Sequence, residues 1–178
     1  LTSASISLLY LPVLTIFFHT ITGTMPQTRK EEVEMDVSEL EAVTQRLLQR
    51  SLGYDAQAAA LIMRVLLYAQ MRGNSQGVIK LLTGGVPAYE ATEGTPIEIE
   101  HETKLSARLH GHGTSGMLVL DRAVTMAITK AKDHGLSIVA AHGTSSGTGA
   151  IGFFARTMAE AGLVGIVLSQ SPELMAPH

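Results

Sequence analysis

The chain contains no cysteine and no tryptophan, and only 16% of its 178 residues are charged. Without cysteine it has no disulfide framework, no thiolate nucleophile and no cysteine-based zinc site. Its formal charge of −3, with the basic residues scattered along the sequence, leaves no electrostatic footprint for nucleic acid. We therefore expect a protein that binds no nucleic acid. Because a cysteine-free chain fits a reducing compartment, we also expect it to be cytoplasmic.

The chain is instead rich in apolar residues, at 46%, and in glycine, with 17 residues. This composition is typical of an α/β protein whose turns pack closely. A length of 178 residues is enough for one domain with a substantial core, or for parts of two domains.

Residues 1–24 differ from the rest of the chain. Ile6–Phe18 is an apolar run interrupted by Pro12, and it is short for a membrane span. No lysine or arginine precedes it, as one would in a secretory signal. We expect residues 1–24 to be an apolar leader outside the fold and the protein to have no membrane partner; an export or anchor segment is the alternative.

Helical periodicity then predicts a helical N-terminal region over residues 25–85. Ser38 and Glu41 form a capping-box pattern at the start of the first helix. The apolar residues expected on its inner face are Leu40, Val43, Leu47 and Leu48. Asp55 predicts the cap of a second helix that ends near Gly73. The short turn between them predicts two antiparallel helices.

Residues 86–178 show the patterns of a second region that contains a sheet. Apolar and polar residues alternate over 97–109, which predicts half-exposed antiparallel strands. Apolar spacing predicts a helix over Met117–His134, ended by Gly135. Leu136–Ala141 predicts a strand buried on both faces, and Val164–Leu168 predicts the strand that follows it.

The segment between these two strands is rich in glycine and hydroxyl residues, and two motifs compete for it. Gly147, Gly149 and Gly152 fit the dinucleotide fingerprint G-x-G-x-x-G. The glycines begin well past the strand end, however, and Val164–Leu168 ends without the acid that would bind a ribose hydroxyl. The spacing therefore disfavours a conventional Rossmann site.

The second motif is the nucleophile elbow G-x-S-x-G, which Gly143, Ser145 and Gly147 fit. A serine hydrolase of this type needs an acid and then a base downstream. The candidates that follow are Glu160, Glu173 and His178. The chain ends there, so a complete triad is not expected.

Four histidines could form a metal site. His110 and His112 would fall on one face of an extended segment, and His101 and His142 could join them as ligands. The flanking glycines and the lack of a nearby carboxylate cluster favour histidines in turns instead. We therefore expect no metal.

Three ordered blocks of sequence carry a resemblance that single motifs do not. They are MRGNSQGVIKL, HGHGTSGMLVLDRAVTMAITKAKDHGLSIVAA and GTGAIGFFARTMAEAGLVGIVLSQSPELMAP. In order and spacing they resemble the blocks R-G-x-x-S-H-G-V-x-R, D-G-x-x-G-x-G and H-F-G-x-x-G-Y-Y-A of the type-2 malate/L-lactate dehydrogenase family. The resemblance runs from about Leu40 to Pro177 and corresponds to the N-terminal half of the family's chains.

This resemblance implies a fold and an activity. The implied fold is α/β, with the helical N-terminal region beside part of a non-Rossmann, largely antiparallel-sheet NAD(P)-binding domain over residues 86–178. The implied activity is hydride transfer between NAD or NADP and a small 2-hydroxy/2-oxo acid or cyclic imino acid. A full-length member is expected to be a homodimer. The G-x-G-x-x-G match then becomes a coincidence of a glycine-rich corner.

The resemblance also assigns catalytic positions. Ser75 matches a family serine, but Gln76 stands where the family has its acid/base histidine. The second family histidine falls on Gly147. Because glutamine does not exchange a proton near neutral pH, His142 is the candidate substitute, five residues before Gly147.

Binding positions follow in the same way. Lys80 stands at the family arginine that binds the substrate carboxylate, which keeps the charge and loses the bidentate geometry. Ser171 matches a serine that contacts the cofactor in relatives, and Gly147 is a further candidate for cofactor contact.

A second interpretation remains open. The family's chains continue well past the third block, and both family histidines are replaced in this chain. The alternative is a truncated or non-catalytic family member that binds a nucleotide or a full-length partner without turnover. Such a chain would leave its last strand without a neighbour, so we expect exposed apolar sequence there.

Overall fold

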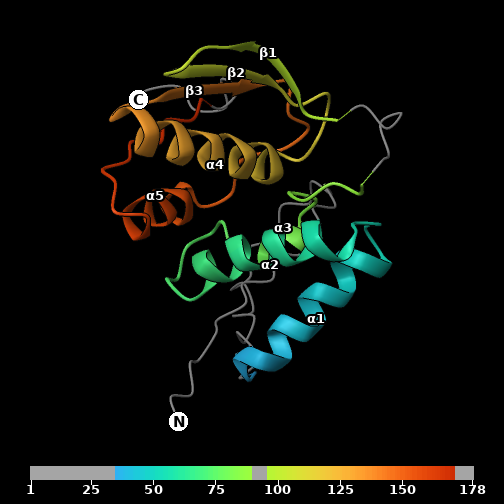
Figure 1. Cartoon of the computed structure of the whole chain (residues 1–178). Helices are drawn as coiled ribbons and strands as arrows, with labels where there is room; N and C mark the ends of the chain where they lie inside the picture. Colours follow the sequence, from blue (N-terminus) through green and yellow to red (C-terminus); the bar gives the residue numbers. More distant parts are fainter. Residues whose placement is uncertain (1–34, 90–95, 171–178) are drawn as a thin grey trace, which may run out of the picture.

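The computed structural model describes residues 35–89 and 96–170 (Figure 1). The predicted leader and Ser171 lie outside these residues. In the described part, three helices precede a three-stranded sheet and two further helices. None of the described helices is both long enough and apolar enough to cross a membrane.

The first group of helices comprises α1 (Val37–Arg50), α2 (Ala56–Gln70) and the single turn α3 (Ile79–Leu82). The Asp36 side chain caps α1, because its Oδ1 accepts the Ser38 N–H at 2.8 Å. The predicted capping box is therefore wrong, since Ser38 lies in the first turn and donates to Asp36. The cap at Asp55 is confirmed by its bond from the Ala58 N–H at 2.8 Å.

From their short turn, α2 runs back roughly opposite to α1, as predicted, and the two helices pack on each other. Figure 1 shows them splaying apart away from the turn. Gly53 has φ +77° in this turn, and the Tyr54 N–H donates back to the Leu48 carbonyl at 3.0 Å. The buried face of α1 consists of Leu40, Thr44 and Leu48, and Leu47 is 40% exposed.

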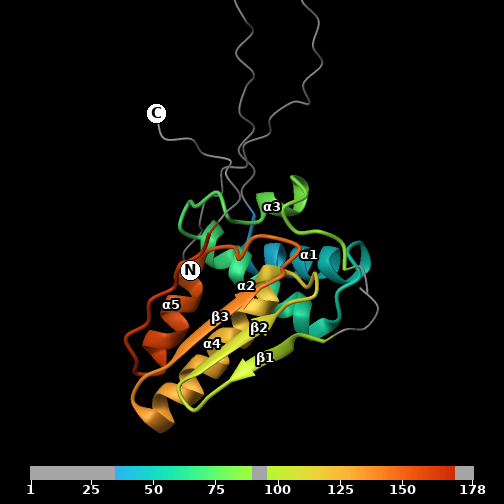
Figure 2. The ribbon, with the colours of Figure 1, turned by 90° about the horizontal axis from the view of Figure 1, so that it is seen from above.

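The sheet has the strand order β1-β2-β3, with β1 (Glu98–Glu102), β2 (Ser106–His110) and β3 (Ile138–His142). The pair β1/β2 is antiparallel, as the alternation over 97–109 predicted, and β2/β3 is parallel. Between β2 and β3 runs α4 (Gly116–His134), which ends at Gly135 in the left-handed conformation, as predicted. Figure 2 shows the sheet lying over α4, which covers one of its faces.

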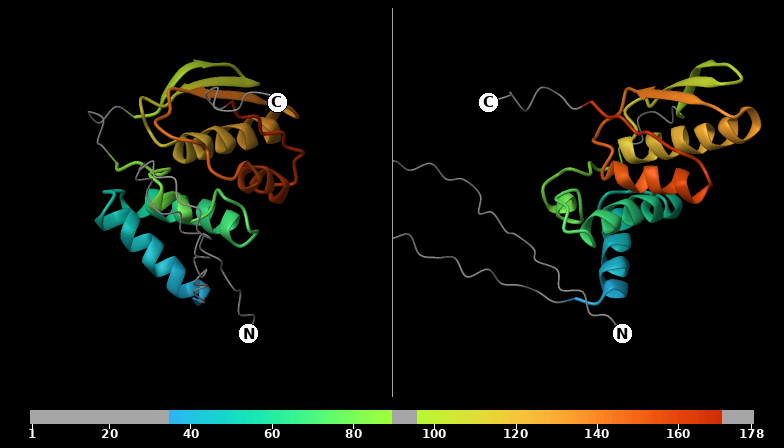
Figure 3. Two further views of the ribbon diagram at one scale, coloured as in Figure 1. Left: turned by 180° about the vertical axis from the view of Figure 1, so that it is seen from behind. Right: turned by 90° about the vertical axis from the view of Figure 1, so that its left-hand side faces the viewer.

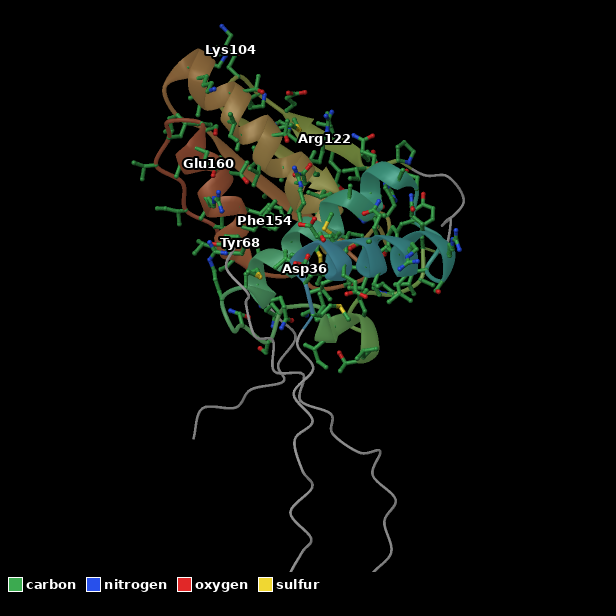
Figure 4. The ribbon with its side chains drawn as sticks, turned by 90° about the horizontal axis from the view of Figure 1, so that it is seen from below. Asp36, Tyr68, Lys104, Arg122, Phe154 and Glu160 are labelled. Carbon is green, nitrogen blue, oxygen red and sulfur yellow. The ribbon has the colours of Figure 1, made fainter. Side chains whose placement is uncertain are left out.

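The core lies between the helices rather than around the sheet. The helix α5 (Ile151–Glu160) packs on α4 and α2. The large buried side chains of this helical core include Phe154, Leu48, Ile62, Leu66, Val65 and Met117. Figure 4 shows Phe154 and Tyr68 at the place where α5 meets α2.

Two strand predictions fail at the side of the sheet beyond β3. Instead of being buried on both faces, β3 is an edge strand among the described residues, and its Ile138 side chain is 68% exposed. The segment Val164–Leu168 is extended but pairs with no described strand. The strand predicted there is therefore wrong, because the segment has no paired neighbour among the residues that the structure describes.

Candidate functional site

Three segments that are far apart in the sequence meet at the end of the sheet where β2 and β3 finish. They are α3, the loop of residues 111–115 before α4, and the loop of residues 143–149 before α5, which we call the corner loop. Two backbone hydrogen bonds join the last two segments: Gly113 N–H to Gly143 O at 2.8 Å, and Ser145 N–H to Thr114 O at 3.1 Å. A third, from the Gly111 N–H to the His142 carbonyl at 2.8 Å, ties the first loop to the end of β3. The corner loop is thus fixed against the start of α4.

Ser146 strengthens this connection through its side chain. Its Oγ accepts the Gly116 N–H at 3.2 Å and lies 3.2 Å from the Ser115 Oγ. It therefore satisfies one of the free N–H groups at the start of α4, where the Ser115 side chain makes no cap of its own. A Cβ on Gly116 would lie 2.5 Å from the Ser146 carbonyl oxygen, so only glycine allows this approach.

The glycines of the dinucleotide-like motif have packing roles. Gly149 has φ +69°, and a Cβ there would lie 2.8 Å from the Val65 Cγ1. A Cβ on Gly152 would lie 3.1 Å from the Tyr68 hydroxyl. Both glycines let the start of α5 approach α2 closely, so neither is open to a pyrophosphate.

Gly147 differs from these two glycines because its neighbour is a charged group. The nearest atom to a Cβ built on Gly147 is the Lys80 Nζ, at 3.8 Å. The lysine comes from α3, and its aliphatic stem packs on Gly85. None of the ion pairs within residues 35–89 and 96–170 involves Lys80. The fold therefore brings together two positions that the sequence predicted for the site, and the Lys80 charge is available to an anion.

Ser75 and Gln76 lie in the turn that leads to Lys80. The Gln76 N–H donates to the Asn74 Oδ1 at 2.8 Å, and Gln76 is half-buried whereas Ser75 is exposed. The turn is held on α2 by Gln70, whose Oε1 accepts the Val78 N–H at 3.1 Å. This hydrogen bond fixes the position at which the turn enters α3, and therefore the position of Lys80.

The His142 side chain, at the end of β3, reaches across the sheet to Glu100 on β1. Its Nε2 lies 2.8 Å from the Glu100 Oε2, and its ring makes an edge contact with His110 at 4.7 Å between centroids. Glu100 also accepts from the Arg108 Nε at 2.7 Å. The hydrogen bond from His142, with its charge and that of Arg108, lowers the pKa of the Glu100 carboxyl. The role of His142 as a proton donor stays a prediction.

Sequence reasoning missed Glu100 and Ser146. Both act across segments that are joined only by the fold: Glu100 reaches β3 from β1, and Ser146 reaches the start of α4 from the corner loop. The alternating acids at Glu98, Glu100 and Glu102 predict one charged face, but the irregular pairing between Ile99 and His101 breaks this alternation, and Glu102 instead pairs with Lys130 of α4. The histidine opposite Glu100 could not be identified without the strand order.

The remaining histidines are close together, but they are not arranged as metal ligands. The rings of His110 and His112 are 4.0 Å apart between centroids, and the His110 Nδ1 accepts the His112 N–H at 3.0 Å. The His112 Nε2 lies 2.8 Å from the Glu98 Oε2. Within the described part of the chain, no three histidine or acidic side chains are placed to hold a metal ion.

Comparison with known proteins gives a consistent result. The family model described as malate/L-lactate dehydrogenase matches residues 35–178. The malate dehydrogenase of Pyrococcus horikoshii is 33% identical over 134 residues, covering 71% of this chain and 36% of that protein. The NAD(+)-dependent ureidoglycolate dehydrogenase of Escherichia coli is 27% identical over 128 residues, covering 70% and 36%.

The structure is similar to solved members as well. The structure of the Pyrococcus horikoshii malate dehydrogenase matches with a TM-score of 0.60 and 28% identity, over 70% of this chain and 36% of that one. The implied α/β fold of this type is thereby confirmed as a partial domain. The chain spans 36% of the length of each of these relatives.

Proposed function

The chain belongs to the malate/L-lactate dehydrogenase family, and we propose that it serves NAD- or NADP-dependent oxidation and reduction of small 2-hydroxy and 2-oxo acids or cyclic imino acids. The observation that supports this most directly is the Lys80 ammonium beside Gly147. A fixed cation next to an open glycine loop suits a substrate that carries a carboxylate. The homodimer expected of full-length members belongs to the same proposal.

In this proposal Lys80 binds the substrate carboxylate. A charge-assisted hydrogen bond of this kind contributes about 1.5–3 kcal/mol. Lysine presents a point charge where the family resemblance implies an arginine, so the carboxylate has more rotational freedom than in a bidentate pair. Ser75 and Gln76, on the turn before α3, would orient the rest of the substrate by hydrogen bonds.

The corner loop suits the phosphates of a nicotinamide cofactor. The Thr144 and Ser145 side chains are exposed, and the backbone at Gly147 is open next to a positive charge. We propose that these groups, with Ser171 further along the chain, hold NAD or NADP. When bound, the nicotinamide supplies or accepts the hydride.

The proton that accompanies the hydride needs a titrating group. The Gln76 amide can orient a substrate oxygen but cannot release a proton near neutral pH. We propose that His142 holds this proton, with Glu100 fixing its imidazole through the 2.8 Å contact. Its test is His142→Ala beside Gln76→His: lost turnover in the first and increased turnover in the second would support the assignment, and unchanged turnover in His142→Ala would reject it.

The second candidate is a non-catalytic family member that binds a nucleotide or a full-length partner. Gln76 and Gly147 favour it, because they stand at the two positions where the family resemblance implies histidines. The two functions differ in turnover, and a member that binds only a full-length partner would also differ in cofactor binding.

The test is a fluorescence titration of the whole chain with NADH and NADPH, followed by a turnover assay with L-malate and L-lactate. Saturable binding with turnover supports the dehydrogenase, and saturable binding without turnover supports the second candidate. Absence of saturable binding of either nucleotide contradicts the dehydrogenase and the cofactor role of Ser171, and leaves the second candidate only as a chain that binds a full-length partner. Asp133→Asn, an exposed change near the end of α4, is the matched control for handling and folding.

A further inference from the structure

Tyr54 is a buried tyrosine in the turn between α1 and α2, and only 4% of it is exposed. Its hydroxyl donates to the Pro87 carbonyl at 2.9 Å and also hydrogen-bonds to the Ser115 hydroxyl at the start of α4. Burial raises the pKa of the Tyr54 phenol, so this group stays protonated near neutral pH. A buried hydroxyl with two partners from other segments connects those segments.

Ser115 continues this connection to the corner loop. Its side chain is buried, and its Oγ lies 3.2 Å from the Ser146 Oγ. Ser146 comes directly before Gly147 in the chain. In the right-hand view of Figure 3, the start of α4 and the corner loop lie side by side, next to the segment that follows α3. Three hydroxyl groups thus link the turn between α1 and α2 to the peptide of Gly147.

The direction of the protons in this chain of hydroxyls is set at its Tyr54 end. A carbonyl oxygen only accepts, so the Tyr54 proton is used on Pro87. Because each hydroxyl has one proton, Tyr54 accepts from Ser115, and Ser115 in turn accepts from Ser146. The Ser146 proton is thereby turned away from the Gly147 carbonyl oxygen, which lies 3.4 Å from the Ser146 Oγ. The Tyr54 hydroxyl therefore determines how the Ser146 hydroxyl is oriented.

The peptide of Gly147 lies between α4 and the lysine of the candidate site. A Cβ on Gly116 would lie 3.0 Å from the Gly147 carbonyl oxygen, so this side of the peptide is closely packed. A Cβ on Gly147 would lie 3.8 Å from the Lys80 Nζ. A small displacement of this peptide changes the place in which Lys80 meets a ligand, and binding and catalysis are sensitive to such displacements.

We propose that Tyr54 is a positioning residue of the candidate site. Through the two serines, its hydroxyl holds the Gly147 peptide where it meets Lys80. This inference rests on the proposed function, because the peptide serves there to bind the small oxyacid and the cofactor. Without the Tyr54 hydroxyl, the Ser115 proton turns to Ser146, and the Ser146 proton turns to the Gly147 carbonyl.

The first test observes the peptide itself, in the whole chain and in Tyr54→Phe, which keeps the ring and removes the hydroxyl. Tyr89→Phe is the matched control, because the Tyr89 ring packs on Tyr54 at 5.5 Å between centroids but is 49% exposed. With isotope-labelled glycine, nuclear magnetic resonance is expected to show shifted amide signals of Gly116 and Gly147 in Tyr54→Phe alone. Gly135, at the other end of α4, is the internal reference.

The second test measures the affinity for L-malate by isothermal titration calorimetry, at a temperature where thermal unfolding shows every variant to be folded. Tyr54→Phe and Ser146→Ala should each weaken binding about threefold to tenfold. The double variant should bind no more weakly than the weaker single variant, because both changes break the same chain of hydroxyls. A merely structural role of Tyr54 would lower the unfolding temperature and leave the affinity unchanged.

The outcomes separate this proposal from the proposed function. A shifted Gly147 signal with a loss of affinity that does not add up in the double variant supports the positioning role. An unchanged Gly147 signal in Tyr54→Phe overturns it, as does an unchanged affinity or a pair of losses that multiply in the double variant. If the parent binds no L-malate, the carboxylate site of the proposed function fails, and the amide signals alone decide whether Tyr54 holds the peptide.

Discussion

The Lys80 Nζ lies 3.8 Å from the position that a Cβ on Gly147 would occupy, although the two residues belong to different regions of the chain. This proximity joins α3 to the corner loop and gives the loop a positive charge. It also leaves ordinary van der Waals space at Gly147, in contrast to the other glycines of this corner.

The first prediction concerns that space. Gly147→Ala should change the free energy of unfolding by less than about 0.5 kcal/mol, because its Cβ meets no atom closer than 3.8 Å. Gly116→Ala should cost about 1–3 kcal/mol, since its Cβ would lie 2.5 Å from the Ser146 carbonyl oxygen. Urea denaturation of both variants measures the difference. Equal losses would show that the corner loop is closed around Gly147 as well.

The second prediction concerns the connection between the corner loop and α4. Ser146→Ala removes the acceptor of the Gly116 N–H and should lower the free energy of unfolding by about 1 kcal/mol, as the loss of a helix cap does. Ser145→Ala is the matched control, because the Ser145 side chain is exposed. A loss in Ser145→Ala as large as in Ser146→Ala would argue against a capping role for Ser146.

The third prediction is a dependence of stability on pH through Glu100. Its pKa is lowered in the folded chain, first by the His142 hydrogen bond, so its contribution to stability is present above the carboxyl pKa of the unfolded chain, about 4.3. The contribution is lost as the pH falls through the lower folded value. Glu100→Gln should therefore be less stable than the parent at neutral pH, and the difference should disappear in acid. Thermal unfolding of the parent and the variant from neutral to acidic pH measures this difference in stability. Glu41→Gln, at an exposed position of α1, is the control. A difference that is constant with pH would contradict this account.

The fourth prediction has the opposite sign. Burial raises the pKa of Asp121 on α4, against the opposing charge of Arg64. The ionised carboxylate is then the unfavourable form, so Asp121→Asn should raise the free energy of unfolding at neutral pH. The gain should shrink as the pH falls through the raised folded pKa of Asp121 and should be absent below the unfolded value of about 3.9, where the parent is neutral in both states. Asp133→Asn, on the exposed side of the same helix, should show no such gain. A stability loss in Asp121→Asn would mean that attraction to Arg64 dominates.

The sequence predicted those parts of the fold that depend on neighbouring residues. The cap at Asp55, the end of α4 at Gly135 and the antiparallel pair β1/β2 follow from local patterns, and the structure confirms them. The burial of β3 could not be predicted, because an apolar run does not state whether a second neighbouring strand is present. The cap of α1 was misassigned since Asp36 and Ser38 are both good capping residues, and only the geometry shows which one accepts.

The residues of the candidate site were likewise predicted only in part. The resemblance selected Lys80 and Gly147, and the fold places them together. The contacts of Ser146 and Glu100 were missed, because each connects segments whose approach depends on strand order and loop path. Ser171 lies outside the described residues, so its contact with the cofactor stays a prediction.

The central claim is that Lys80 holds the carboxylate of a small oxyacid at the corner loop. Isothermal titration calorimetry of the whole chain with L-malate tests it most directly, in the parent and in the variants Lys80→Met and Lys80→Arg. Lys132→Met, at an exposed position of α4, is the control. We expect affinity to fall about tenfold or more in Lys80→Met, to be largely kept in Lys80→Arg, and to be unchanged in Lys132→Met. Equal affinity in the parent and Lys80→Met would contradict the account.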